Sequence, residues 1–411
     1  MRKDLDVTIA RGTWPASGTP AFPTAFHSGK QAKSINVNST LLLIGHLTTP
    51  TTGRGVSLSE LWAWVRYYYA IAPAHDLRLT REFWELDAHQ KTILSDDFGI
   101  GFPMSFLINP LNLVGWSDGR DFADRFSALT VPLPSLPKKS GPTKSPDFVC
   151  LDAHGRFHVI ECKGTQSGQA KRAKQFSDTN AKGVATGAIV QKQMIVLQPA
   201  YQGQRLACGI AIAREGAKQS SDLRIEDPDG DEKIFVNADQ VSLAADPIFR
   251  ATAARSLRAA GLSETADTIA APSGPDLVSR SDPRPIARRR EARRQAFIEE
   301  RRGRARAELR AGIATPGFVK RKERYVGRHI VMHLPKPVTI EGKNYTRIEI
   351  REGVHRQAAS DLMGGALEDV PIQEAASWLP ALLSGITLKG EPTSAELIIG
   401  DFFVSDLHFL S

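Results

Sequence analysis

Two short apolar runs separated by a turn form the clearest pattern in the chain. Residues 147–152 (DFVCLD) and 156–162 (RFHVIEC) are rich in β-branched and apolar side chains. The three residues between them end in glycine, which is typical of a β-hairpin loop. A hairpin centred on His154 brings Asp147 directly opposite Glu161. Both faces of the hairpin are mainly apolar, which predicts a central position in a sheet covered on both sides.

The whole chain divides into four predicted regions. Residues 1–80 are expected to be mainly helical after an irregular start, with an aromatic-rich helix that Ser57 caps. Residues 81–245 form the predicted core, which begins with a helix and contains the hairpin. Residues 246–328 contain a proline-rich linker and an Arg-rich helix. Residues 329–411 alternate apolar and polar positions in several places, which predicts a small C-terminal α+β domain.

The aromatic stripe of the first region has two interpretations. Trp62, Trp64, Tyr67, Tyr68 and Tyr69 fall close together in the sequence. Aromatic side chains of this kind stack on nucleic-acid bases in some proteins. They serve more often in core packing, and we favour that interpretation.

Length and composition indicate an ordinary soluble protein. The 411 residues are enough to bury a sizeable core without disulfides. Three cysteines exclude a disulfide framework and fit a reducing compartment. The first residues lack the apolar core of a signal peptide, and the longest nearly apolar run is too short to span a bilayer. We therefore expect a cytoplasmic protein with no membrane association.

The positive charge of the chain is concentrated in one segment. The net charge is +8, and residues 284–310 contain eleven arginines and four glutamates. Residues 284–328 together carry +11, so the remainder of the chain is slightly acidic. Ala, Arg and Glu are strong helix formers, which predicts a largely exposed basic helix. Such a helix is either a solvated linker or an arm that contacts nucleic-acid phosphates.

Three charged residues lie at one end of the predicted hairpin. Asp147 and Glu161 are in register, and Lys163 shares the face of Glu161 because side chains alternate along a strand. Two carboxylates so close repel each other unless a proton or a cation lies between them. Hard oxygen ligands favour Mg²⁺ or Mn²⁺. The alternative is a surface salt bridge between Lys163 and one of the carboxylates.

Pro146-Asp147 followed by Glu161-Cys162-Lys163 resembles the PD-(D/E)xK nuclease superfamily. The resemblance implies an α/β restriction-endonuclease-like core, in which helices flank a mixed central sheet. It also implies that Asp147, Glu161 and the backbone carbonyl of Cys162 hold Mg²⁺ or Mn²⁺, while Lys163 orients or activates the attacking water. The metal would polarise the phosphate and lower the pKa of bound water.

The resemblance suggests further site residues. An acidic residue from a preceding helix is expected, and of Asp96 and Asp97 we choose Asp97, for which a helix cap is the alternative role. Gln191, before a later strand, is a further catalytic candidate. The predicted phosphate-contacting side chains are Lys171, Arg172 and Lys174 after the hairpin, and Arg288, Arg289, Arg290, Arg293 and Arg294 in the Arg-rich helix.

Three functional hypotheses follow. The first is a metal-dependent endonuclease that acts on nucleic acid, DNA in preference to RNA, in restriction or antiviral defence; the defence role is an analogy at the level of the fold. The second is a catalytically silent, nuclease-like subunit that binds nucleic acid within a larger complex. The third is that the basic helix binds an acidic partner protein. Cutting both strands with one site per chain would favour a homodimer.

Overall fold

The computed structural model describes most of the chain. The described residues are 1–14, 20–51, 64, 66–129, 145–177, 196–197, 202–227, 235–236, 240–271, 285–315, 317–366 and 379–411. The predicted helix after Ser57, Trp62, the proline-rich linker and Gln191 lie wholly or largely outside these residues.

A seven-stranded mixed sheet contains the predicted hairpin. Its strands are β1 (Arg2–Ile9), β2 (Gly29–Asn36), β3 (Leu113–Asp118), β4 (Phe148–Asp152), β5 (Phe157–Thr165), β7 (Gln202–Ala211) and β8 (Asp222–Glu226). The order across the sheet is β2-β1-β8-β7-β5-β4-β3. The pairs β5–β7 and β1–β8 are parallel, and the other neighbours are antiparallel.

A six-stranded antiparallel sheet forms the C-terminal part. Its strands are β10 (Phe318–Lys320), β11 (Glu323–Ile340), β12 (Lys343–His355), β13 (Ile386–Glu391), β14 (Ser394–Ile399) and β15 (Phe403–Leu410). The order is β10-β11-β12-β15-β14-β13, and the sheet is curled. Short elements accompany the two sheets: a 3-10 helix (Arg11–Thr13), α12 (Arg356–Asp361), a π-helix (Leu362–Ala366), α14 (Leu379–Leu383), and the two-stranded pair β6 (Val196–Leu197) and β9 (Phe235–Val236).

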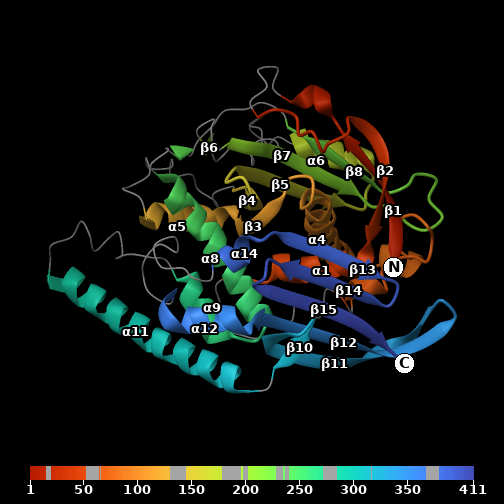
Figure 1. Cartoon of the computed structure of the whole chain (residues 1–411). Helices are drawn as coiled ribbons and strands as arrows, with labels where there is room; N and C mark the ends of the chain where they lie inside the picture. Colours follow the sequence, from red (N-terminus) through yellow and green to blue (C-terminus); the bar gives the residue numbers. More distant parts are fainter. Residues whose placement is uncertain are drawn as a thin grey trace.

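The longer helices lie between the sheets and around them. They are α1 (Val37–Thr48), α4 (Ala88–Leu107), α5 (Gly119–Leu129), α6 (Gln169–Ser177), α8 (Val241–Ala259), α9 (Ser263–Ala270) and α11 (Pro285–Ala314), with the single turn α3 (Arg81–Trp84) before α4. Helix α4 contacts β5 and β7, and α1 contacts α4 together with β13 and β14 (Figure 1). Helix α8 likewise contacts β3, β4 and β12. None of the helices that the structure describes is both long and apolar enough to cross a membrane.

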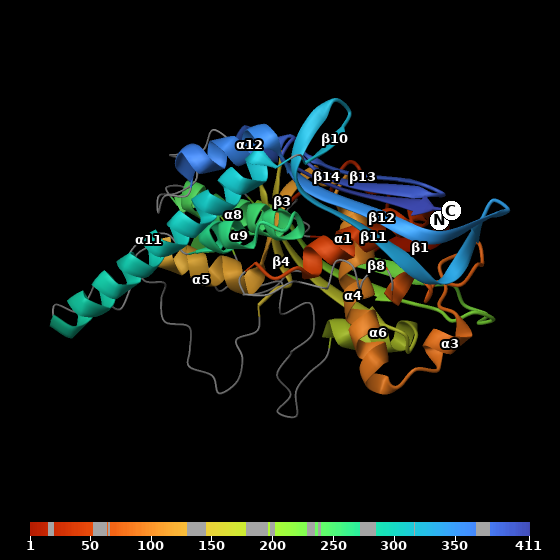
Figure 2. The same cartoon turned by 90° about the horizontal axis from the view of Figure 1, so that it is seen from below.

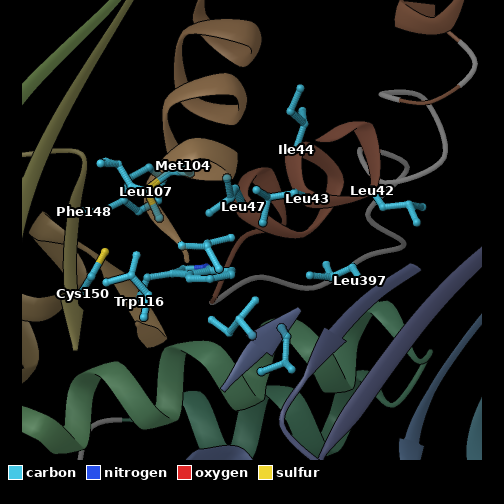
Figure 3. Close-up of a cluster of buried hydrophobic side chains, with 14 of the residues drawn as sticks. Leu42, Leu43, Ile44, Leu47, Met104, Leu107, Trp116, Phe148, Cys150 and Leu397 are labelled. Carbon is cyan, nitrogen blue, oxygen red and sulfur yellow. The ribbon is translucent and has the colours of Figure 1, made fainter. Parts of the chain in front are cut away.

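One continuous core joins the two sheets. Leucines of α1, Met104 and Leu107 of α4, Trp116 of β3 and Leu397 of β14 gather in the same buried cluster (Figure 3). Each of these side chains is nearly or fully inaccessible to water. Because core burial dominates the free energy of folding, the C-terminal sheet is stabilised by the same core that supports the hairpin.

The hairpin has the predicted register. Cys150 pairs with His158, and Phe148 pairs with Ile160, as expected for a loop centred on His154. All residues of β4 are buried, and β5 lies between β4 and β7. The prediction of a hairpin inside a sheet covered on both faces is therefore confirmed.

The predicted irregular start of the N-terminal region is wrong, because it contains two strands before the helix α1. Residues 2–9 and 29–36 form β1 and β2, which belong to the same sheet as the hairpin. Leu5, Val7 and Ile9 are buried on one face of β1, while the alternate positions are more exposed. This two-residue period is the signature of a strand with one covered face.

The aromatic residues that the structure describes serve in packing. Trp64, Tyr67 and Tyr68 are buried, and Trp64 stacks on Tyr68 at 4.6 Å between ring centroids. The interpretation of this stripe as core is thus confirmed for these three residues.

Helix α4 and strand β5 approach each other so closely that neither can carry a side chain at the contact. A Cβ atom on Gly164 would lie 1.7 Å from the carbonyl oxygen of Ser95. A Cβ on Gly99 would lie 2.5 Å from the nitrogen of Gly164. Gly164 directly follows Lys163, so this backbone contact fixes α4 beside the end of the hairpin.

Substitution of Gly164 by alanine is expected to destabilise the fold, because backbone on both sides must move to admit the methyl group. Overpacking of this kind costs roughly 1–3 kcal/mol. Urea denaturation of Gly164→Ala should show the loss. The control is Gly303→Ala in α11, where a Cβ meets no atom within 4 Å, and where alanine should stabilise by at most about 1 kcal/mol. Equal unfolding midpoints for Gly164→Ala and wild type would contradict the described contact.

Candidate functional site

The candidate site lies where β5 runs past the start of β4. Strand β4 begins at Phe148, which pairs with Ile160, so Glu161 and the residues after it have no partner on β4. On the other side β5 remains paired with β7 through Thr165. The backbone edge of β5 is therefore open on one side at the position of the candidate residues.

The side chain of Asp147 takes the place of a neighbouring strand at this open edge. Its Oδ2 accepts a hydrogen bond of 2.7 Å from the backbone N–H of Cys162. Its own N–H donates to Oε2 of Glu161 at 3.0 Å. These reciprocal bonds bring the two carboxylates together, as the predicted register required.

Glu161 is inaccessible to water, and Lys163 donates a hydrogen bond to its Oε1. Burial, and then the charge of Asp147, raises the pKa of Glu161 to about 8. Burial also raises the pKa of Asp147, against the opposing effect of Lys163. Glu161 is fully buried and Asp147 half-buried, and two carboxylates this close favour a shared proton or a bound cation between them.

Lys163 remains a cation at neutral pH. Burial alone would lower its pKa, but the charges of Glu161 and Asp147 outweigh this effect and raise the pKa above its usual value. The side chain is 25% exposed, whereas that of Glu161 is fully buried. The ion pair predicted as an alternative thus exists, but its carboxylate lies in the interior, where burying charges is costly.

The two faces of β5 are covered by different helices. Gly209, the β7 partner of Lys163, would direct a Cβ into Phe176 and Arg172 of α6. Partners in register share a face of the sheet, so α6 covers the face that carries Glu161 and Lys163. Helix α4 covers the opposite face at Gly164.

The choice of Asp97 as the acidic residue from the preceding helix is not supported. Asp97 accepts a hydrogen bond from the hydroxyl of Tyr67 and lies in the middle of α4, so it is not a helix cap either. Its neighbour Asp96 is the residue that interacts electrostatically with Lys163 and Asp147. Successive helical residues point about 100° apart, which separates the two aspartates.

Asp118 is a site residue that the sequence analysis missed. It ends β3 opposite Phe148, and its charge helps to raise the pKa of Asp147. Arg255 of α8 donates to its Oδ2 at 2.7 Å. The available signal was an acidic residue just after the apolar run 113–116 and Ser117.

The residues fit a divalent cation. Asp147, Glu161 and Asp96 each interact electrostatically with Lys163, so the carboxylates outnumber the cation here once Glu161 loses its proton. Asp118 and Arg255 pair with each other. Within the described part of the chain, no group of three or more His, Cys, Asp or Glu side chains is placed to hold a metal ion. Mg²⁺ typically uses one or two carboxylates and completes its shell with water and substrate oxygens. Asp147, Glu161 and the Cys162 carbonyl would supply such a partial set.

The predicted phosphate-contacting residues have different environments. Lys171 and Lys174 are exposed on α6. Arg172 is buried and pairs with Asp222 of β8, so its assignment to nucleic acid is wrong; it ties α6 to the sheet instead. Gln191 lies outside the described residues.

The Arg-rich helix α11 has a packed half and a projecting half. Ala305 and Leu309 are fully buried, and Glu308 accepts the N–H of Thr265 in α9 at 2.8 Å. The other half extends beyond the body (Figures 1 and 2), with Ile286 71% exposed. Arg288, Arg289 and Arg293 are exposed, Arg294 is half-buried, and the side chain of Arg290 is outside the described set.

Comparisons with known proteins identify no relative. No protein-family model, no curated protein and no solved structure matches the chain. Function must therefore be argued from the site itself.

The raised pKa of Glu161 predicts a stability that falls with rising pH in the absence of divalent metal. Between its ordinary value near 4.5 and about 8, the folded protein holds a proton that the unfolded chain has lost. The free energy of unfolding therefore falls as the pH rises through this window, by a total on the order of a few kcal/mol.

Glu161→Gln should remove this dependence and make the metal-free protein more stable than wild type at the upper end of the window. Thermal unfolding across the window, with EDTA present, measures the effect. Glu215→Gln, at an exposed position, is the control and should follow the wild-type curve. Parallel curves for wild type and Glu161→Gln would show that Glu161 does not hold the proton.

Proposed function

We propose that the protein is a metal-dependent endonuclease that hydrolyses phosphodiester bonds, of DNA in preference to RNA. The observation that supports this most is the convergence of Asp147, Glu161 and Lys163 at the open edge of β5. A fully buried glutamate paired with a half-buried aspartate beside a lysine contributes little to stability by itself. It is suited to binding a metal and a phosphate together.

Each of the three side chains has a distinct role in this proposal. Asp147 and Glu161, with the carbonyl of Cys162, hold Mg²⁺ or Mn²⁺. The bound ion would polarise the phosphate and lower the pKa of a water molecule. Lys163, a cation at neutral pH, stabilises the negative charge that develops on the phosphate and orients the attacking water by hydrogen bonding.

Asp96 and Lys171 extend this site. Asp96 adds a carboxylate from α4, whose charge interacts with Lys163. In this proposal it orients a water molecule next to the metal. Lys171 and Lys174 are exposed on the helix that covers the Glu161 face, and they attract the substrate backbone. Arg288, Arg289 and Arg293 on the projecting half of α11 form a second basic surface that contacts phosphates without reading sequence.

A catalytically silent, nucleic-acid-binding subunit is the second candidate. It is favoured by the direct ion pair of Lys163 with Glu161, which occupies one of the carboxylate oxygens that a metal would need. Restriction or antiviral defence is the biological setting that we infer for either function, by analogy of fold class alone.

Cleavage should require the metal and each of the three residues. We expect nicking or cutting of plasmid, linear duplex, single-stranded DNA or RNA with Mg²⁺ or Mn²⁺, and none with EDTA. Asp147→Ala and Lys163→Ala should lower the rate by at least about a hundredfold, the scale of lost acid–base or electrostatic catalysis. Asp97→Asn is the control, and it should retain activity because Asp97 binds Tyr67.

Full activity of Lys163→Ala would contradict the nuclease assignment. Binding of nucleic acid without cleavage under every metal condition would favour the silent subunit.

The projecting half of α11 should contribute a salt-dependent part of nucleic-acid affinity. Replacing Arg288, Arg289 and Arg293 with Gln removes three phosphate contacts, which should reduce the slope of log affinity against log salt by about 2 to 3. Binding measured from about 50 to 200 mM salt tests this. The control is Arg347→Gln in β12 of the C-terminal sheet. An unchanged slope would indicate that α11 docks a protein instead.

A further inference from the structure

A cavity of about 290 Å³ lies beyond the ends of the parallel strands β5 and β7. Its wall is formed by Trp84 of α3, by residues 166–169 between β5 and α6, and by residues 211–214 at the end of β7. Ligands of open α/β sheets commonly bind at the carboxyl ends of parallel strands. The volume is near the lower end of the range for small-molecule sites.

Aromatic surface and positive charge meet in this cavity. Trp84 is half-buried, and Arg214, which also lines the cavity, is exposed. The guanidinium carbon of Arg214 lies 5.9 Å from the Trp84 ring centroid, and Nζ of Lys91 lies 5.8 Å from it. An aromatic ring flanked by cations is the combination that proteins use for the bases and phosphates of single strands.

Gln166 lines the same cavity and has an unpaired acceptor. The residue is only 7% exposed, and its Nε2 donates to the carbonyl of Lys91 and to Oγ of Ser95, each at 3.2 Å. Its Oε1 is buried and has no hydrogen-bond partner among the described residues. A buried acceptor without a partner is costly, and a donor from a ligand that reached it would relieve this cost.

The start of α6 adds a site for an anion. Gly168, with φ of +85°, turns the chain from β5 into the helix, which begins at Gln169. Residues 167–169 line the cavity, so the first N–H groups of α6 lie at its wall. Helix N-termini favour phosphate through these N–H groups and the helix dipole.

We propose that this cavity binds one nucleotide of an unpaired strand, next to the candidate cutting site. The base packs on Trp84 and bonds to Oε1 of Gln166, and the phosphate lies between Arg214 and the start of α6. This assignment rests on the proposed nuclease function and specifies its substrate as single-stranded or locally opened nucleic acid.

The position along β5 agrees with this assignment. Gln166 follows Lys163 by three residues, or about 10 Å along an extended chain. A strand covers such a distance with a few nucleotides at most. One strand can therefore reach both the cavity and the carboxylate pair. A paired base could not stack on Trp84 without leaving its duplex.

The test measures binding by fluorescence anisotropy, with labelled single-stranded DNA, single-stranded RNA and the matched duplex, all in EDTA so that no strand is cut. Trp84→Ala should weaken single-strand binding about tenfold, the usual effect of losing one stacking partner. Trp84→Phe should restore most of it. Arg214→Gln should weaken binding more than Arg81→Gln, which removes the same charge from an exposed position of α3 that does not line the cavity.

The comparison of DNA with RNA identifies which strand the cavity prefers. Wild-type affinity for single strands retained in both Trp84→Ala and Arg214→Gln would overturn the proposal, as would the absence of wild-type binding to any single strand. Cleavage is measured separately with Mn²⁺. If binding depends on Trp84 but no strand is cut, the nucleotide site is supported and the nuclease function is contradicted. If strands are cut equally well by wild type and Trp84→Ala, the nuclease function is supported and the nucleotide site is contradicted.

Discussion

The burial of Glu161 beside Asp147 is the constraint on which the candidate site depends. Two carboxylates are joined by reciprocal backbone bonds, and Glu161 is fully buried while Asp147 is half-buried, so water screens the pair poorly. Burial, and then the charge of Asp147, raises the pKa of Glu161, while the charges of the two carboxylates raise the pKa of Lys163. The arrangement costs stability, and a divalent cation would relieve that cost. This is the physical reason for interpreting the cluster as functional.

The fold creates this constraint by ending one strand before its neighbour. Because β5 extends past the start of β4, an N–H at its edge is left for the Asp147 side chain instead of a strand. The close contact of Gly164 with α4 then holds Asp96 near Lys163, while α6, tied to β8 by Arg172, covers the other face. The same strand continues into the wall of the Trp84 cavity. The candidate catalytic residues and the proposed nucleotide cavity thus lie along one strand.

Local patterns in the sequence predicted the hairpin, but not the elements whose position depends on distant partners. The turn at His154 and the apolar runs fixed the register that joins Asp147 and Glu161. The choice between Asp96 and Asp97 depends on the rotation of α4 about its axis, which its contact with Gly164 determines. Strand β1 showed a two-residue apolar period, yet its parallel partner β8 is about two hundred residues away. Arg172 resembled a surface cation because its partner, Asp222, lies in another strand.

The most direct test of the central claim is calorimetric titration of Mn²⁺ into the metal-free protein, in two buffers with different ionisation enthalpies. The account predicts binding at Asp147 and Glu161 with release of protons, because metal replaces the proton that the raised pKa of Glu161 retains at neutral pH. Asp147→Ala should abolish both the binding and the proton release. Binding of Mn²⁺ that persists unchanged in Asp147→Ala, or no binding to the wild type, would contradict the account.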